Sequence, residues 1–327
     1  MGTAESSTFL AAEPQKKRLK NKSLHSALSS VNMVGLGLAT KFLVTYSAVA
    51  GFFAQDSASV NSTALGAIPP RFGLLDDAAG HWTRFKLNVT HLNAHASHGT
   101  SYKVFFLGRH GQGYHNVAES TYGTTAWDDH WSKLTGDGNI TWGPDALLTP
   151  TGETQAAGAR TAWKKELADG VPLPTKFISS PLRRALDTWK ITFAEAPKGE
   201  KPVLELNRRK ALIYENAREM YGVHTCDERS NKTTLVNLYP RQTYTFESPF
   251  PEQDPLWDAD VRESSAHVVE RALTILDKAF QSSDTYISIT AHSGFITGFL
   301  TAIGHPKYSL PTGGMIPVVV KVSRTSS

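Results

Sequence analysis

The sequence predicts an α/β fold, because short apolar segments alternate with longer helical segments from about Pro69 onward. Three runs have the length and composition of buried strands, namely residues 102–107, 175–179 and 286–291. Two longer segments, residues 149–167 and 263–280, carry apolar side chains at helical spacing. Each predicted strand runs into a short polar segment. Ligands of open α/β sheets bind outside the carboxyl ends of the strands, so these polar segments predict one common site.

Local features support each of these elements. The first strand (YKVFFL) is a nearly continuous apolar run that stops at Gly108, as expected of a strand buried on both faces. The first helix begins with Thr149, whose hydroxyl can cap it, and carries Glu153 in its first turn. Residues 230–260 contain four prolines and therefore predict an insertion of loops over one face of the sheet.

The chain divides into a leader, residues 1–60, and one domain, residues 69–325. Within the leader a basic segment precedes an apolar stretch, residues 31–54, and Phe42 to Ala54 form an uncharged run of 13. That length suits a signal peptide, and Ala48-Val-Ala50 offers a small-x-small cleavage pattern. Five glycosylation sequons also favour the secretory pathway, with the protein secreted or membrane-anchored through residues 31–54. A cytoplasmic or mitochondrial location is the alternative.

Charge and cysteine content narrow the classes of partner. The net charge of +4 arises from basic residues within the first 41 positions, so the rest of the chain is neutral. A neutral domain gives no electrostatic reason to expect nucleic acid as a partner. The single cysteine, Cys226, excludes an internal disulfide framework.

The segment after the first strand has the composition of a phosphate site. Gly108 and Gly111 flank Arg109 and His110, so the backbone can approach a ligand closely while the guanidinium offers a planar fork to phosphate oxygens. After the second strand, Ser180-Pro marks a helix start and places Arg184 in its first turn, where free amides also favour an anion. After the third strand comes His292. One histidine can act as nucleophile, and another can donate hydrogen bonds to the phosphoryl oxygens.

A departing alkoxide needs a proton, which calls for a carboxylic acid. Two glutamates, Glu215 and Glu219, lie in a segment dense in ionisable groups that follows an apolar start. From the residues alone, either could be the acid. The same segment continues through His224 to Arg229.

Together these motifs resemble the histidine phosphatase superfamily, in particular its fungal and plant phosphoglycerate mutase-like branch. The resemblance extends from about Phe72 to Lys321 and implies a three-layer α/β/α sandwich with loop insertions over the active-site face. It implies that His110 is phosphorylated and that the phosphate-pocket positions are Arg109, Asn116, Arg184 and His292. The family's Leu-x-Glu-x-x-x-Gly proton donor corresponds best to Glu219, although Gly222 lies one residue closer here. Candidate substrate-binding residues are Gln112, Glu215, His224 and Arg229.

The expected function is a phosphatase that hydrolyses a phosphorylated small molecule through a phosphohistidine, without a cofactor or a metal. A phosphoglycerate mutase-type phosphotransferase is the first alternative, although true mutases resemble Arg-His-Gly-Glu where this chain has Gln112. A non-catalytic binding module on the same fold is the second. His95 and His98 have a spacing that could bind a metal, but no cysteine or second carboxylate cluster joins them.

Overall fold

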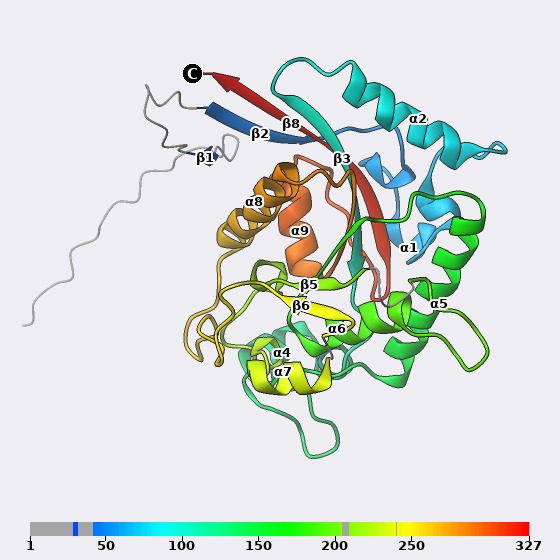
Figure 1. Ribbon diagram of the computed structural model, residues 1–327. Coiled ribbons are helices and arrows are strands. Elements are labelled where there is room, and N and C mark those ends of the chain that lie inside the picture. The colour runs from blue at the N-terminus through cyan, green and yellow to red at the C-terminus, as the bar shows by residue number, and fades with distance from the viewer. Residues whose placement is uncertain (1–28, 32–41, 205–208, 240, 327) are drawn as a thin grey trace, which may run out of the picture.

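The computed structural model describes residues 29–31, 42–204, 209–239 and 241–326 (Figure 1). The basic segment of the expected leader, its sequon at Asn21 and residues 32–41 of its apolar stretch lie outside the described residues. The helices are α1 (Ser62–Leu65), α2 (His81–Ala94), α3 (Tyr114–Tyr122), α4 (Thr124–Asp129), α5 (Pro150–Ala168), α6 (Arg183–Trp189), α7 (Lys232–Leu238), α8 (Ser265–Gln281) and α9 (Ser293–Ala302). The strands are β1 (Ser29–Val31), β2 (Phe42–Ala48), β3 (Thr100–Arg109), β4 (Lys176–Ser179), β5 (Ala211–Ile213), β6 (Tyr244–Phe246), β7 (Tyr286–Ala291) and β8 (Met315–Ser326).

In the described part of the chain one mixed sheet has the strand order β1-β2-β8-β3-β7-β4-β5-β6. The five strands from β3 to β6 in this order run parallel. On the other side of β3, β8 pairs antiparallel with β3, β2 with β8, and β1 with β2. Parallel neighbours bring their carboxyl ends to the same edge. Because β3, β7 and β4 are adjacent, the segments that follow them meet there.

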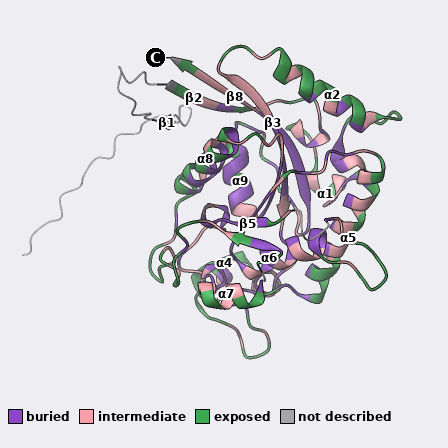
Figure 2. Cartoon of the chain, in the orientation of Figure 1, coloured by how far each residue is buried: buried purple, intermediate pink, exposed green. Residues whose placement is uncertain are grey.

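Helices cover both faces of the sheet, and the side chains of β3 show why. Phe105 and Leu107 point into one apolar core, which includes residues of α8 and α9, while Val104 and Phe106 point into a second core that includes residues of α2, α5 and α6. Strand side chains alternate between faces, so an uninterrupted apolar run fills both layers. Figure 2 shows the buried strands between partly exposed helices. The predicted three-layer α/β/α sandwich is therefore confirmed.

Most predicted elements lie within two residues of their positions in the structure. The strand expected at residues 102–107 extends to Thr100–Arg109, and residues 286–291 form β7. Thr149 caps α5, its side chain accepting from Gly152 N at 3.1 Å. The predicted helix from residue 263 begins at Ser265, with Ser264 as its cap.

The described sheet includes residues that precede the expected start of the domain at residue 69. Strand β2 pairs with β8 along its whole length, from Phe42 opposite Ser326 to Ala48 opposite Val320. Val44 and Tyr46 are buried in the core, and Phe53 is 1% exposed. A cleavage site after Ala50 would remove this strand. No described helix has the length and apolar character that crossing a membrane requires.

The proline-rich segment, residues 230–260, is more than loops. It contributes α7 and the short strand β6, which pairs parallel to β5 and forms one edge of the sheet. The remainder of the segment is irregular, as predicted, and is held by ion pairs described below.

Candidate active site

The carboxyl ends of β3, β7 and β4 bring the predicted site residues together. His110 follows β3 directly, His292 follows β7, and Arg184 lies in the first turn of α6 after β4. All three side chains are buried, with exposed fractions of 1%, 0% and 0%. The rings of His110 and His292 lie with centroids 4.9 Å apart.

One hydrogen bond fixes which nitrogen of His110 can react. Its Nδ1 lies 2.6 Å from the carbonyl oxygen of Gly111. A carbonyl only accepts, so Nδ1 carries the proton and Nε2 keeps a free lone pair. Burial lowers the pKa of His110 well below 6.5, and the charges of Arg184 and Arg109 lower it further. The ring is therefore neutral at physiological pH, as a nucleophile must be.

Arg184 is held by the segment that follows Glu219. Its Nη1 donates to the carbonyl of Cys226 at 2.6 Å, and its Nη2 donates to Asp227 at 2.8 Å. Burial opposes the ionisation of Asp227, but Arg184 and Arg262 hold the pKa of this carboxyl below its ordinary value. The carboxylate thus fixes the guanidinium, whose Nε is buried without a partner among the described residues.

Other buried polar nitrogens around His110 also lack partners in the described part of the chain. These atoms are Nε of Arg109 and Nδ1 of His292. Arg109 is fixed by a hydrogen bond from Nη1 to the carbonyl of Leu310 at 2.9 Å, and His292 by a contact of 2.7 Å between Nε2 and Oγ of Ser180. Asn116 caps α3 by accepting from Gly113 N at 3.0 Å. Buried polar groups without partners are costly, and a phosphoryl group could satisfy such donors.

Glu219 lies beside His292 at the amino end of α9. Its carboxylate accepts from the amides of Met220 at 2.9 Å and Gly294 at 3.0 Å. A Cβ on residue 294 would meet Oε1 of Glu219 at 2.0 Å, so only glycine permits this approach. The side chain is half-buried, and its charge acts on Arg109. A carboxyl group thus stands at the edge of the pocket.

Glu215 has a different environment, and Arg229 shares it. Oε1 of Glu215 accepts from Nε of Arg229 at 2.6 Å, and Oε2 faces Arg218 at 3.4 Å. Arg229 also donates to the carbonyls of Pro251 and Gln253, each at 2.8 Å. Both residues were candidates for substrate binding, and in this structure their polar atoms are bonded within the protein. They fix the proline-rich segment against the turn that carries Glu219.

The sequence model of a protein family, the histidine phosphatase superfamily (branch 1), matches residues 105–310. The chain belongs to this superfamily. A "Probable phosphoglycerate mutase" of Arthroderma benhamiae is 42% identical over 86% of each chain. The "Probable phosphoglycerate mutase PMU1" of Saccharomyces cerevisiae is 38% identical over 68% of this chain and 79% of that protein. A "Phosphoglycerate mutase-like protein" of Arabidopsis thaliana is 28% identical over 62% and 75%. The predicted relationship to fungal and plant proteins is confirmed.

Two further predicted residues of this histidine phosphatase superfamily member flank the pocket. Oε1 of Gln112 accepts from the hydroxyl of Thr149 at 2.8 Å, which connects the histidine loop to α5. His224 is half-buried against Trp127, and its Nε2 lies 3.7 Å from Asp128. His224, Cys226 and Asp227 form the one described group with metal-ligand spacing. However, the two carboxylate oxygens of Asp227 already accept from Arg184 and Arg262.

Sequence reasoning missed His115. Its ring is 9% exposed, and its centroid lies 5.3 Å from that of His110. The residue stands next to Asn116 in the first turn of the helix that follows the histidine loop. No local sequence pattern indicates this contact, which arises because the first turn of α3 packs back on the histidine loop.

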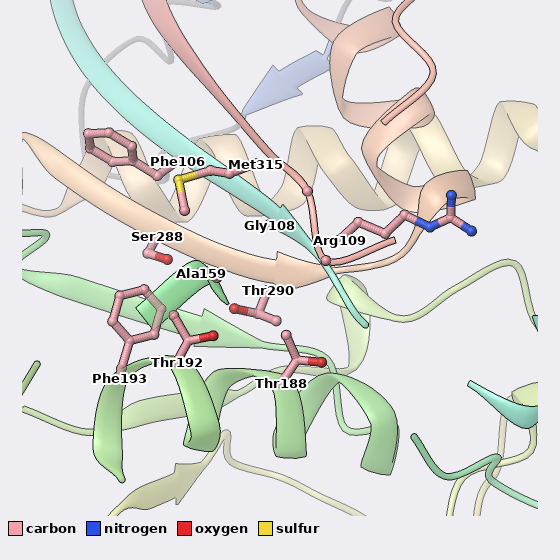
Figure 3. Close-up of a pocket in the computed structure, with 12 residues that line it drawn as sticks. Phe106, Gly108, Arg109, Ala159, Thr188, Thr192, Phe193, Ser288, Thr290 and Met315 are labelled. Atoms are coloured by element: carbon pink, nitrogen blue, oxygen red, sulfur yellow. The ribbon is translucent and has the colours of Figure 1, made fainter. Parts of the chain in front are cut away.

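A small cavity with a largely apolar lining lies beneath the site (Figure 3). Its volume is about 20 Å³, and hydroxyl-bearing residues lining it include Thr188, Thr192, Ser288 and Thr290. That space is large enough for one water molecule but too small for a phosphorylated substrate. Thr188 connects this layer to the site, since its hydroxyl accepts from Gly111 N at 3.0 Å and donates to the carbonyl of Arg184 at 2.7 Å. The side chain of Arg109 extends away from the cavity.

Proposed function

We propose that this histidine phosphatase superfamily member hydrolyses a phosphorylated small molecule through a phosphohistidine on His110. The observation that carries the proposal is the hydrogen bond of 2.6 Å between Nδ1 of His110 and the Gly111 carbonyl, because it leaves a lone pair on Nε2. The lowered pKa keeps that nitrogen unprotonated. Arginines and histidines supply donors for the charge that develops on the phosphoryl oxygens.

The reaction has two steps. In the first, the Nε2 lone pair of His110 forms a bond to phosphorus, and the ester oxygen departs with the electron pair of the broken bond and a proton. In the second, water attacks phosphorus, the nitrogen–phosphorus electron pair returns to Nε2, and inorganic phosphate leaves. A base accepts the proton of the attacking water.

Glu219 fits the role of the acid in the first step and the base in the second. It stands at the pocket edge, its charge acts on Arg109, and two backbone amides hold its carboxyl in place. Glu215 is bound to Arg229 and Arg218 instead.

A phosphoglycerate mutase activity is the second candidate, favoured by the names of the fungal relatives. In a mutase the phosphoenzyme returns its phosphoryl group to a second oxygen of the substrate rather than to water. An assay with 3-phosphoglycerate and its bisphosphate primer separates the two. Accumulation of 2-phosphoglycerate without inorganic phosphate would select the mutase.

The covalent step is tested with a labelled phosphomonoester in the presence of a chelator, since the site's positive charge comes from side chains. We expect acid-labile label on His110 of the wild-type protein. His110→Ala should abolish turnover, and His292→Ala should leave a rate lower by about 10²–10³-fold, because only His110 makes the covalent bond. Label on a serine or an aspartate, or activity that requires added zinc or magnesium, would refute this mechanism.

A further inference from the structure

His115 lies at the phosphate site but has no part in the two steps above. It is in the first turn of α3, with its ring centroid 5.3 Å from that of His110. Its Nδ1 is buried and has no hydrogen-bond partner among the described residues. A buried polar atom without a partner costs free energy, so its presence here calls for an explanation.

Gly113, two residues before His115, leaves space for the imidazole ring. A Cβ on residue 113 would meet Nδ1 of His115 at 2.6 Å and Cε1 at 2.7 Å. These distances are shorter than real Cβ contacts, so any side chain at position 113 would displace the imidazole. The backbone of Gly113, with φ of −100°, is one that other residues also adopt. Glycine is therefore needed here for space around the ring and not for its backbone freedom.

The surroundings of His115 are those of the phosphate pocket. Burial lowers its pKa well below 6.5, and the positive charges of Arg184 and Arg109 lower it further. A neutral imidazole carries one N–H donor and one acceptor. Next to two arginines, a neutral ring can approach the phosphoryl group without adding a third buried positive charge.

We propose that His115 donates a hydrogen bond from a ring N–H to an oxygen of the phosphoryl group carried by His110. The inference rests on the proposed function for its catalytic consequence. The hydrogen bond strengthens as negative charge spreads over the equatorial oxygens, so it contributes to the transition state and to the binding of inorganic phosphate.

Substitutions that remove or restore the donor test this role. His115→Phe keeps an aromatic ring but has no N–H, and should lower kcat/KM for nitrophenyl phosphate by about 10²-fold. It should also weaken inhibition by inorganic phosphate by about tenfold. His115→Asn and His115→Gln each carry an amide donor near one of the two ring nitrogens, and one of them should recover most of the loss. His130→Phe, at an exposed position, is the matched control. Full activity and full phosphate inhibition in folded His115→Phe would overturn the proposal.

A double-mutant cycle remains informative if His115→Phe fails to fold. Gly113→Ala should lower phosphate affinity when His115 is present, because the methyl group displaces the ring. In a His115→Ala background the ring atoms are gone and the methyl group meets the Leu147 carbonyl oxygen at 3.2 Å, so its further effect should be much smaller. Equal losses in both backgrounds would overturn the proposal. Phosphate binding measured by calorimetry needs no turnover, so this result is independent of whether the wild-type protein is a phosphatase.

Discussion

Glu215 and Glu219 lie four residues apart, but their surroundings suit one to catalysis and the other to a structural role. Glu219 stands at the pocket edge with a half-buried carboxyl, whereas Glu215 is paired with Arg229 at 2.6 Å. We expect Glu219→Gln to lose far more rate with glycerol phosphate than with nitrophenyl phosphate, because nitrophenolate departs without a proton. The comparison of kcat/KM for the two substrates measures this selectivity.

Glu215→Gln should act on stability instead. Removing one partner of a buried ion pair leaves an uncompensated charge and typically costs about 3–5 kcal/mol. Urea unfolding should show a loss near the lower end of that range, because Arg229 keeps its carbonyl partners. Rates with the two substrates should fall together, if at all. A leaving-group-dependent loss in Glu215→Gln but not in Glu219→Gln would reverse the assignment.

Three of the residues that sequence reasoning placed at the site share one property. His110 and His292 directly follow apolar strands, and Arg184 begins the helix after a third, so position along the chain predicts position in space. His115 and Asp227 lack this property. His115 reaches the site because α3 packs back on its own loop, and Asp227 because a turn from another part of the chain meets Arg184. Such contacts depend on tertiary structure, which no local pattern contains.

At the scale of elements, β2 is the feature that sequence reasoning misread. An uncharged run of 13 residues has the length of a signal-peptide core, and its polar positions, such as Thr45 and Ser47, were not sufficient to show a strand. The alternation of apolar and polar residues in β2 identifies a strand only when its pairing partner, β8, is known. The parallel strands β3, β4 and β7 were predictable because both of their faces are apolar.

Adjacent positions of β2 offer a matched test of this strand. Val44 is 5% exposed in the core, whereas Leu43 is 39% exposed. Val44→Asp places a carboxyl group in the core and should cost more than about 2 kcal/mol of unfolding free energy. Leu43→Asp, on the opposite face, should cost less than about 1 kcal/mol. Urea unfolding of the full-length variants measures both. Equal effects at the two positions would mean that β2 is not part of the folded domain.

At the scale of the whole molecule, the phosphate site couples stability to pH. Burial lowers the pKa values of His110, His115 and His292 well below 6.5, and neighbouring arginines lower them further. Below pH 6.5 the unfolded chain binds a proton at each of these positions, whereas the folded protein does not. Lowering the pH through this range therefore stabilises the unfolded state. Above pH 6.5 neither state holds these protons, and the effect disappears.

The contribution of one histidine can be isolated by difference. A single histidine that stays neutral in the folded protein over this whole interval removes about 2 kcal/mol of unfolding free energy between pH 8 and pH 5. We expect His115→Gln, which cannot take up a proton, to lose about 2 kcal/mol less than the wild-type protein over that interval. Urea unfolding at the two pH values measures the difference, and His130→Gln controls for the loss of a histidine at an exposed position. If wild type and His115→Gln lose the same stability, the His115 ring accepts a proton in the folded protein. A charged ring would then stand beside Arg184 and Arg109, and the donor to the phosphoryl group would be an imidazolium.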